Sequence, residues 1–297
     1  MSNSRIRSSV SDRAFTTSVY IFITVIALIS LYPFIYVLSM SFSDPKAAAA
    51  GEVFFWPVGL SIMAYERVFM NKDIWQAFYN SFWYTIVGTL SMIAFTIMAA
   101  YPLSRPQFFA KKFFNAMFVF TMFFYGGLIP FFQVVRVTGL TDSRWALVIP
   151  YLIEAWNMII CRVYFQSLPE SLYESAKIDG ANEFSLLWRI TLPLSKQIIA
   201  VLALYYGISN WNGWFAAILF LSDSKLHPLQ VFLKRVLTEA NSADVMMSYA
   251  NIGTQGMLSL MQVKYAIIIV ASIPIIALYP FVQKYFEKGV MIGSLKG

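Results

Sequence analysis

Residues 174–193 read ESAKIDGANEFSLLWRITLP, and this stretch decides how the chain is organised. It carries acidic and basic side chains on both sides of an Asp179–Gly180 turn signal, and it lies between two long apolar runs. A segment this polar does not enter the hydrocarbon layer of a bilayer. We therefore expect the rest of the chain to form a membrane frame that presents residues 174–193 at an aqueous surface.

Composition predicts an integral membrane protein. Of the 297 residues, 59% are hydrophobic and only 12% are charged, and the mean hydropathy is +0.63. These values lie outside the range of soluble globular domains. The net charge of +7 does not indicate nucleic-acid binding, because the Lys and Arg residues are spread over the loops and form no basic stripe. The single cysteine, Cys161, lies in an apolar run and is predicted to be a small buried residue.

Six apolar runs predict an all-α integral membrane protein with six transmembrane helices in one domain, residues 1–297. The predicted spans are residues 17–42, 79–103, 113–135, 145–165, 197–221 and 264–286. The first run is longer than the core of a signal peptide, so we interpret it as an uncleaved span that is kinked at Pro33. In the third run, Gly126, Gly127 and Pro130 are expected to loosen the backbone and let neighbouring helices approach.

The distribution of Lys and Arg predicts that both termini are cytoplasmic. An even number of spans places the termini on one side, and the excess of basic residues on that side is clearest at the N-terminus and in the turn 105–112. Residues 167–193 are then cytoplasmic, and the loops 43–78 and 222–263 face outward.

Residues 167–193 are predicted to form two short surface helices joined by a turn at Gly180. Ser167 and Glu170 have the spacing of a capping box, which predicts a helix that starts at Leu168. Gly180 is expected to end this helix. The expected apolar stripe is Leu168, Leu172 and Ala176, and a second apolar patch follows at Phe184, Leu187, Trp188 and Ile190. The geometry alone leaves open that this segment only anchors its flanking spans at the membrane surface.

A resemblance favours a more specific function for this segment. Glu174, Ala176, Asp179, Gly180, Ala181, Ile190, Leu192 and Pro193 resemble the EAA loop of bacterial ABC importer permeases, with the same spacings over twenty residues. Two positions depart from that pattern, since Ser175 replaces an alanine and Gln197 stands where many relatives carry proline. The resemblance implies a coupling helix that docks on an ATPase subunit, and the implied contact residues are Glu174, Ser175, Ala176, Asp179, Gly180 and Ala181.

Further stretches resemble the carbohydrate-importing permeases of this class. They are GGLIP at 126–130, GLTDSRWALVIP at 139–150, WNGW at 211–214 and the tail at 284–297. Within this class the chain is similar to the second membrane subunit of maltose-type and oligosaccharide-type systems, including those for lipo-oligosaccharides, alginate and other polysaccharide fragments. This implies a subunit of the bacterial cytoplasmic (inner) membrane whose partners are a second, different permease, two ATPase subunits, an extracytoplasmic solute-binding protein and a sugar or oligosaccharide substrate. No cofactor is expected on this chain, and ATP and Mg would be bound by the ATPase subunits.

The sequence contains none of the motifs that would indicate a catalytic function. There is no GxxxxGK phosphate loop, no GxSxG nucleophile elbow and no cluster of potential metal ligands. The only histidine, His227, is expected to be a solvated residue of the second outer loop. The chain is therefore predicted not to be an enzyme and to hold no metal.

Polar residues within the spans are candidates for the substrate path, because polar groups are costly in hydrocarbon. Glu154 and Asn157 share a face of the fourth span, and Asn210, Trp211, Asn212 and Trp214 interrupt the fifth. Indole faces and amides suit the rings and hydroxyls of sugars. The alternatives are that the amides join helices, and that Glu154 is protonated or paired with the partner permease. No Lys or Arg lies deep in a span, so the charge of an acidic sugar is expected to be met mainly by other subunits.

The second outer loop carries a small, polar segment that is predicted to reach the binding protein. In maltose-type relatives the corresponding loop enters the binding protein, and the candidate contact residues here are Asn251, Gly253, Thr254 and Gly256. The alternative is a loop that only packs on the membrane surface.

Two function classes follow from the sequence. The first is an importer permease driven by partner ATPases. The second is a self-contained secondary carrier or channel, although no convincing internal repeat of the kind found in such carriers is present.

Overall fold

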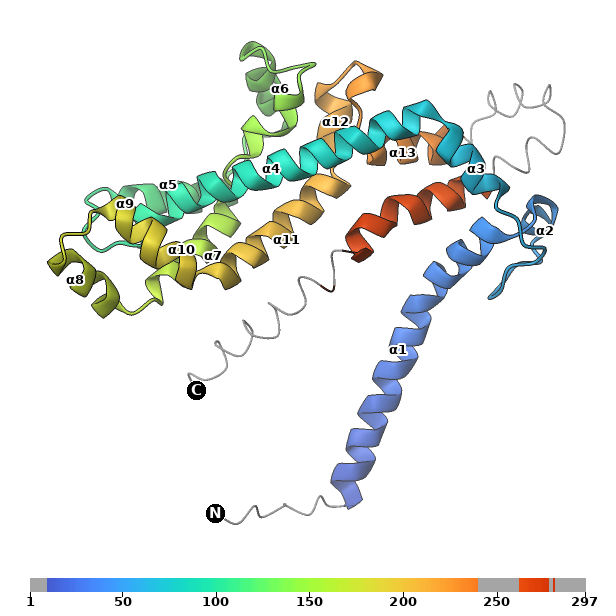
Figure 1. Cartoon of the computed structure of the whole chain (residues 1–297), viewed down its shortest axis with the longest axis horizontal. Helices are drawn as coiled ribbons and strands as arrows, with labels where there is room; N and C mark the ends of the chain where they lie inside the picture. The colour runs from blue at the N-terminus through green and yellow to red at the C-terminus, as the bar shows by residue number, and fades with distance from the viewer. Residues whose placement is uncertain (1–9, 240–261, 278–279, 281–297) are drawn as a thin grey trace. The chain divides into compact units, whose positions relative to one another are not determined.

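The computed structural model describes residues 10–239, 262–277 and 280, and within these ranges the chain is helical and has no β-strand (Figure 1). The helices are α1 (Val10–Phe42), α2 (Pro45–Ala50), α3 (Met63–Met70), α4 (Lys72–Ser104), α5 (Lys111–Phe123), α6 (Leu128–Val137), η1 (Arg144–Leu147), η2 (Ile149–Tyr151), α7 (Ala155–Gln166), α8 (Glu170–Ile178), α9 (Glu183–Leu186), the π-helical η3 (Leu187–Thr191), α10 (Leu192–Leu194), α11 (Lys196–Asn212), α12 (Phe215–Phe220), η4 (Ser224–Leu226) and α13 (Leu229–Glu239). A further apolar helix covers Gln262–Ala277.

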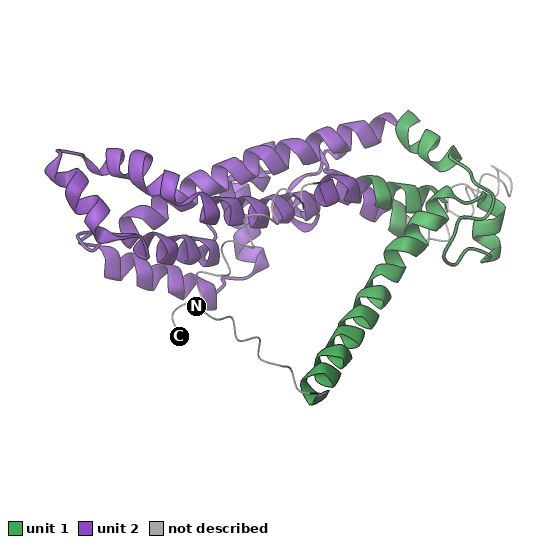
Figure 2. Ribbon diagram, turned by 60° about the horizontal axis from the view of Figure 1, so that its bottom comes forward, with its two compact units in different colours: residues 1–70, 236–270 green, residues 71–235, 271–297 purple. Residues whose placement is uncertain are grey.

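The chain divides into two compact units, which Figure 2 distinguishes by colour. One unit consists of residues 1–70 and 236–270, and the other consists of residues 71–235 and 271–297. The candidate functional residues that the structure describes lie in the second unit.

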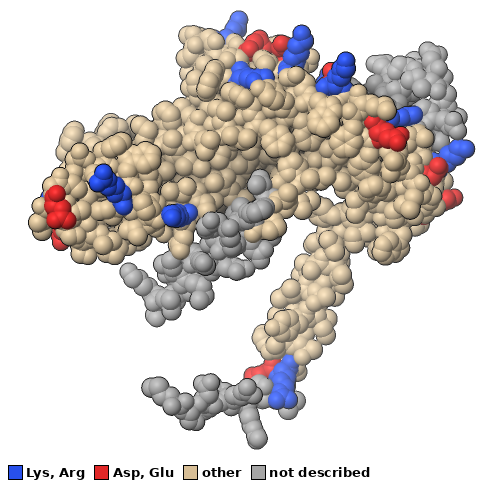
Figure 3. Space-filling view, in the orientation of Figure 1, with Lys and Arg blue, Asp and Glu red and all other residues tan. Residues whose placement is uncertain are grey.

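In the first unit, α1 is an apolar helix whose side chains are largely exposed. None of its most apolar 18-residue window is buried, and along its length Figure 3 shows charged side chains only near its N-terminal end. The helix continues through Pro33 and ends at Phe42. Its last turns carry Ser39, which donates to the Phe55 carbonyl at 2.7 Å, and Ser41, which shares a 2.8 Å hydrogen bond with the Tyr65 hydroxyl. These bonds hold the following loop to the end of α1, whereas the rest of the helix needs an apolar environment.

Two described helices, α1 and α4, are long and apolar enough to cross a membrane by themselves. Three bent pairs reach that length only when both partners are counted: α5 with α6, the η1–η2 segment with α7, and the α9–α10 segment with α11. The predicted run 79–103 lies within α4, which starts seven residues earlier because the Asn71 side chain accepts a hydrogen bond from the Asp73 amide at 2.9 Å.

The apolar run 113–135 is not one helix. It forms α5 and α6, whose axes differ by 119°. Gly127 has φ +92°, in a region that favours glycine, and Pro130 occupies the third position of α6, where a missing N–H costs no helical hydrogen bond. The glycine pair thus breaks the run, beyond the loosening that the sequence predicts.

Runs 145–165 and 197–221 are also interrupted. In the first, the 3₁₀ turns η1 and η2 lead to an extended Glu154, and α7 begins only at Ala155, at an angle of 49° to the preceding turns. In the second, α11 stops at Asn212, Gly213 is extended, and α12 starts at Phe215. The predicted run 264–286 is helical over its described part, up to Ala277.

The core of the second unit lies where α4 packs against α7 and α11. Its buried members are Met92, Ile97, Ala100, Tyr101, Leu103, Met158, Cys161, Phe165, Tyr173, Leu186, Ile198, Leu202 and Tyr206. Cys161 is fully buried, as the sequence predicts. Within this core the hydroxyls of Thr96 and Tyr206 share a 2.7 Å hydrogen bond, which satisfies both polar groups away from water.

A glycine on α4 lets α11 approach closely. A Cβ built on Gly88 would lie 2.9 Å from Nδ2 of Asn210, the amide that donates to the Thr89 hydroxyl at 3.2 Å. Gly207, on the facing helix, has more room, since a Cβ there would meet the Thr89 hydroxyl at 4.0 Å. The two glycines therefore offer a matched pair for testing this contact.

We expect Gly88→Ala to destabilise the protein relative to Gly207→Ala by about 1–3 kcal/mol, because the added methyl displaces Asn210 from its hydrogen bond. Both substitutions share the intrinsic gain of replacing glycine in a helix, so the difference between them isolates the steric effect. Thermal unfolding of the purified protein in detergent measures it. Equal melting temperatures for the two variants would contradict the close approach.

Candidate functional site

The first helix of the candidate site, α8, begins at Glu170 and not at Leu168. The capping box predicted from Ser167 and Glu170 is wrong, because the Ser167 hydroxyl donates backward to the Tyr164 carbonyl at 2.7 Å and caps nothing in α8. Pro169 fills the N-cap position and makes no side-chain hydrogen bond to α8. Serine hydroxyls bond to the preceding turn of a helix in this way, so the residue closes α7.

The end of α8 lies where the sequence predicts it. Gly180 adopts φ +80°, its amide donates to the Lys177 carbonyl at 3.0 Å, and the Ala181 amide donates to the Ala176 carbonyl at 2.9 Å. This pair of hydrogen bonds is a Schellman motif, and glycine suits its left-handed position. The chain then turns, and Asn182 caps α9 by accepting from the Ser185 amide at 2.8 Å.

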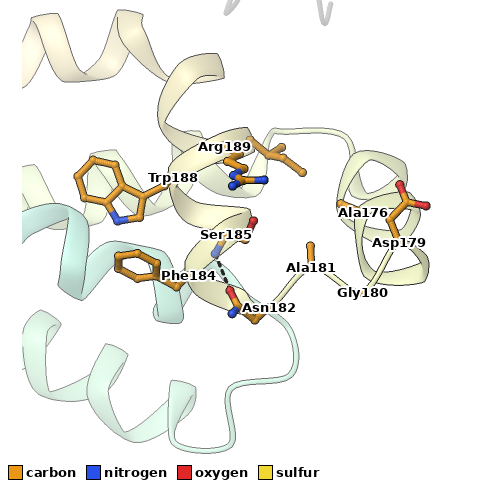
Figure 4. Close-up of a pocket in the computed structure, with 10 residues that line it drawn as sticks. Ala176, Asp179, Gly180, Ala181, Asn182, Phe184, Ser185, Trp188 and Arg189 are labelled. Carbon is orange, nitrogen blue, oxygen red and sulfur yellow. Dashed lines mark hydrogen bonds between the residues drawn. The ribbon is translucent and has the colours of Figure 1, made fainter.

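An open pocket of about 640 Å³ lies between α8 and the α9–η3 segment. Figure 4 shows Ala176 and Asp179 on one side of it, Phe184, Ser185, Trp188 and Arg189 on the other, and Gly180–Asn182 joining the two sides. The rings of Phe184 and Trp188 lie 5.9 Å apart and are largely exposed, at 69% and 56%. Exposed aromatic rings beside a concave surface are typical of a docking site for another protein.

The buried face of α8 differs from the predicted stripe by one residue. Tyr173, which is not part of the predicted stripe, is 1% exposed, whereas Leu172 is 39% exposed. The guanidinium of Arg105, at the end of α4, lies 3.7 Å from the Tyr173 ring centroid and 3.4 Å from the Glu170 carboxylate. The Tyr173 hydroxyl shares a 3.0 Å hydrogen bond with Thr191. A pattern of Tyr173 with Ala176 at i+3 would have identified this face.

Glu183, in α9, connects this helix to α8 and α4. Its carboxylate lies 3.0 Å from the Lys177 ammonium on α8 and accepts a 2.8 Å hydrogen bond from the Tyr101 hydroxyl on α4. Partial burial tends to raise the pKa of Glu183, but the hydrogen bonds from Lys177 and Tyr101 and the charges of Lys177 and Arg105 outweigh it, so the pKa is lowered. The carboxylate is therefore charged at neutral pH and holds α8, α9 and α4 together.

The residues predicted to contact an ATPase subunit gather at this surface. Glu174, Ser175, Asp179 and Gly180 are exposed, and Ala176 and Ala181 are half-buried. Four of the six line or bound the pocket: Ala176, Asp179, Gly180 and Ala181. The Ser175 hydroxyl bonds back to the Ser171 carbonyl at 3.0 Å, so it adds little bulk or unsatisfied polarity to the surface.

The predicted substrate-path residues at the end of α11 and the start of α12 differ in burial and surroundings. Asn210, Asn212 and Trp214 line a second pocket of about 380 Å³, together with Tyr84 and Tyr151. Trp211 is buried in the protein: its indole N–H donates to the Ala271 carbonyl at 3.1 Å, and its ring meets Phe82 edge-on at 5.2 Å. Trp211 therefore joins helices, and it also lines a separate, largely apolar pocket of about 350 Å³ with Phe82 and Gly207.

Glu154 and Asn157 interact with each other. The Asn157 amide donates to the Glu154 carboxylate at 2.6 Å, and Asn157 is buried while Glu154 is exposed. Glu154 precedes α7 in extended backbone, so the two do not lie on one continuous helix as predicted. The spacing of three residues nevertheless brings their side chains into contact.

His227 is more tightly held than the sequence predicts. Its Nε2 lies 3.0 Å from the Leu221 carbonyl, and the ring is half-buried. No group of His, Cys, Asp or Glu within residues 10–239 and 262–277 is arranged to bind a metal ion. The predicted binding-protein contacts Asn251, Gly253, Thr254 and Gly256 lie outside the described residues.

Comparison with known proteins identifies the class to which these helices belong. Residues 1–292 match the family described as "binding-protein-dependent transport system inner membrane component". The chain belongs to this family. It is 38% identical over 286 residues to the polygalacturonan/rhamnogalacturonan transport system permease protein YtcP of Bacillus subtilis (strain 168), covering 96% of this chain and 99% of that protein. It is also 38% identical over 291 residues to Protein LplC of the same organism, covering 97% and 96%.

A solved structure has a similar fold. A chain from the crystal structure of a bacterial ABC transporter involved in the import of the acidic polysaccharide alginate matches with a TM-score of 0.87 and 38% identity, covering 94% of this chain and 99% of that one. The resemblance to importer permeases is thus confirmed. This inner membrane component is a transport subunit and not an enzyme, and ATP hydrolysis lies in partner subunits. The secondary-carrier alternative gains no support from these relatives.

Substitutions of Gly180 are predicted to destabilise the α8–α9 turn to different degrees. A Cβ at this position would meet no atom within 4 Å, so the cost of substitution comes from the left-handed backbone alone. Gly180→Asn should be tolerated, while Gly180→Ala should cost roughly 1 kcal/mol and Gly180→Val more. Hydrogen exchange at the Ala181 amide measures this, with an expected loss of protection of about fivefold for alanine. Equal protection in all three variants would disprove the strain argument.

For Glu183 we predict a pH-dependent contribution to the order of residues 170–194. Because its folded pKa is lowered, the carboxylate stabilises this segment fully above the usual glutamate pKa and loses its effect as pH falls through the lowered value. Exchange protection of the segment should therefore be lower in Glu183→Gln than in the wild type at neutral pH, and the difference should vanish in acid. Glu66→Gln, an exposed acid in α3, is the control. A difference independent of pH would refute the role of the charge.

Proposed function

We propose that this chain is one of two different permeases of an importer that moves an acidic oligosaccharide into the cytoplasm, with six membrane spans and both termini cytoplasmic. The observation that carries the proposal is the α8–α9 surface, which displays an exposed Glu174 beside a pocket lined by small and aromatic residues. The relatives named for a polygalacturonan/rhamnogalacturonan transport system and for alginate import support an acidic cargo.

The topology is supported by helix length and by charge. The helices α1 and α4, the bent pairs α5–α6 and η1–η2 with α7, and α11 with α12 supply five candidate spans, and the apolar helix Gln262–Ala277 overlaps the sixth predicted run. The basic residues of the N-terminus and of the 105–112 turn favour the cytoplasm for the termini and for α8.

In this assembly α8 is the coupling helix. Glu174 would enter a groove of an ATPase subunit and pair with a basic residue there, while Ala176, Gly180 and Ala181 let the partner backbone approach. Two ATPase subunits would bind ATP and Mg, and this chain would bind no cofactor. The segment with Asn251, Gly253, Thr254 and Gly256 would contact the solute-binding protein on the opposite side of the membrane.

The cargo path would pass the pocket at the break between α11 and α12. Asn210, Asn212 and Trp214 offer amides and an indole there, and helix breaks in membrane transporters commonly lie where substrate passes. Glu154 and Asn157, which bond to each other, are the second candidate group of the path.

Reconstitution of both permeases, the ATPase subunits and the binding protein in lipid nanodiscs tests the proposal. A galacturonate or mannuronate oligosaccharide bound to the binding protein should stimulate ATP hydrolysis, and a neutral oligosaccharide should stimulate it less. Glu174→Ala should lower the stimulation by at least tenfold, because the ion pair to the ATPase subunit is a charge-assisted contact. Glu52→Ala, an exposed acid of the predicted outer loop, should leave it unchanged. Full stimulation in the Glu174 variant would contradict the coupling role.

A further inference from the structure

A buried arginine joins the end of α4 to α8. Arg105 directly follows α4, and its guanidinium lies over the Tyr173 ring of α8, 3.7 Å from the ring centroid. One of its N–H groups donates to the Glu170 carboxylate at 3.4 Å, whereas its buried Nε makes no hydrogen bond within the described residues. A buried charge is costly unless it is paired. This guanidinium therefore depends on the few contacts that it has.

The tyrosine ring, and not the glutamate, is the main partner of Arg105. The Glu170 side chain is 49% exposed, and an ion pair that water reaches contributes little to stability. Tyr173 is almost completely buried, and a cation–π contact is strongest where water is excluded. Arg105 therefore binds α8 mainly through the face of the Tyr173 ring.

Both partners in this contact are fixed within their own elements. The Arg105 amide donates to the Pro102 carbonyl at 3.1 Å, which orders the backbone at the end of α4. The Tyr173 hydroxyl shares a 3.0 Å hydrogen bond with Thr191, and the Thr191 hydroxyl donates to the Leu186 carbonyl at 3.2 Å. The α8 helix and the α9–η3 segment thus present one ring, in a fixed orientation, to Arg105.

The strength of the contact depends on the relative position of the two helices. A cation–π attraction requires the cation to lie over the face of the ring, within about 6 Å of its centroid. A displacement of α8 without α4 would carry the Tyr173 ring away and leave the Arg105 charge buried without its main partner. The arrangement therefore favours movement of α4 together with α8.

Resting on the proposed function, we propose that Arg105 is a positioning residue that couples the movement of α8 to α4. When the ATPase subunit displaces α8, the Arg105–Tyr173 contact makes the end of α4 follow. The Tyr101–Glu183 hydrogen bond links α4 to α9 one turn earlier, but the Glu183 side chain is 57% exposed and water competes for it. Arg105 provides the buried connection, and it belongs to none of the residues predicted to contact the ATPase subunit.

The test measures ATP hydrolysis by the reconstituted complex, with and without the binding protein and a galacturonate trisaccharide, and uptake of the trisaccharide per ATP hydrolysed. Arg105→Gln should lower the stimulated part of hydrolysis on the order of tenfold and keep basal hydrolysis within about twofold of the wild type. Uptake per ATP should also fall. Arg105→Lys should restore most of the stimulation, because an ammonium also binds over an aromatic ring.

The matched control for the loss of charge is Lys112→Gln. This substitution removes a positive charge at an exposed position near the start of α5, in the same short connection after α4. Its stimulation, basal hydrolysis and uptake per ATP should all equal those of the wild type.

A second set of variants separates the Tyr173 ring from its hydroxyl. Tyr173→Phe retains the aromatic face and loses only the bond to Thr191, whereas Tyr173→Leu removes the face. We expect Tyr173→Phe to keep most of the stimulation and Tyr173→Leu to lose it as Arg105→Gln does. The double variant Arg105→Gln/Tyr173→Leu should be no worse than either single variant, because both remove the same interaction.

Three outcomes would overturn the role of Arg105. They are wild-type stimulation in Arg105→Gln, additive losses in the double variant, and a parallel fall of basal and stimulated hydrolysis or a loss of subunits, which would show that Arg105 only maintains the fold.

The proposed function is checked in the same assay with Glu174→Ala. A wild-type complex without stimulation, or full stimulation in Glu174→Ala, would remove the proposed function and the role of Arg105 with it. If Glu174→Ala loses stimulation and Arg105→Gln keeps it, only the role of Arg105 is refuted.

Discussion

The packing of α4 against α7 and α11 is the interaction on which the rest of the second unit depends. Backbone groups in a bilayer must be satisfied within the protein, so a break in a span is tolerated only where a neighbouring helix covers it. The continuous α4 provides this cover for its broken neighbours. Its Gly88 admits the Asn210 amide at the end of α11, and its Tyr101 and Arg105 hold the α8–α9 segment. A shorter or kinked α4 would leave these contacts without a common support.

The two candidate surfaces differ in how they are built. The shape of the α8–α9 surface is fixed by local contacts, namely the Schellman turn, the Asn182 cap, the buried Tyr173 and the Glu183 carboxylate. Its other side chains remain exposed. The pocket at the α11–α12 break is assembled from segments far apart in sequence, with Tyr84 from α4 and Trp214 from the break. The first surface can therefore be recognised in a continuous motif, whereas the second exists only in the folded chain.

Sequence reasoning succeeded where the signal is local. Hydropathy predicts the membrane class, and Gly180 marks the end of α8. It failed where tertiary contacts decide: Ser167 bonds back to α7, and Tyr173 replaces Leu172 on the buried face. The α5–α6 break follows from Gly127, whose φ of +92° favours glycine, yet the 119° angle between the two helices depends on neighbours that a one-dimensional pattern does not contain.

The length of α4 has a mechanical consequence. Tyr101 contacts the α8–α9 segment near one end of this helix, and Ser81 holds the loop before α13 near the other. Twenty residues separate them, which corresponds to about 30 Å of unbroken helix. Because α4 is unbroken between these two contacts, a tilt at one of them also moves the other. A rotation of α8 that keeps the Tyr101–Glu183 contact therefore also moves the start of α13, which Ser81 holds. The motion is transmitted by the α4 backbone itself and needs no chain of intermediate side chains.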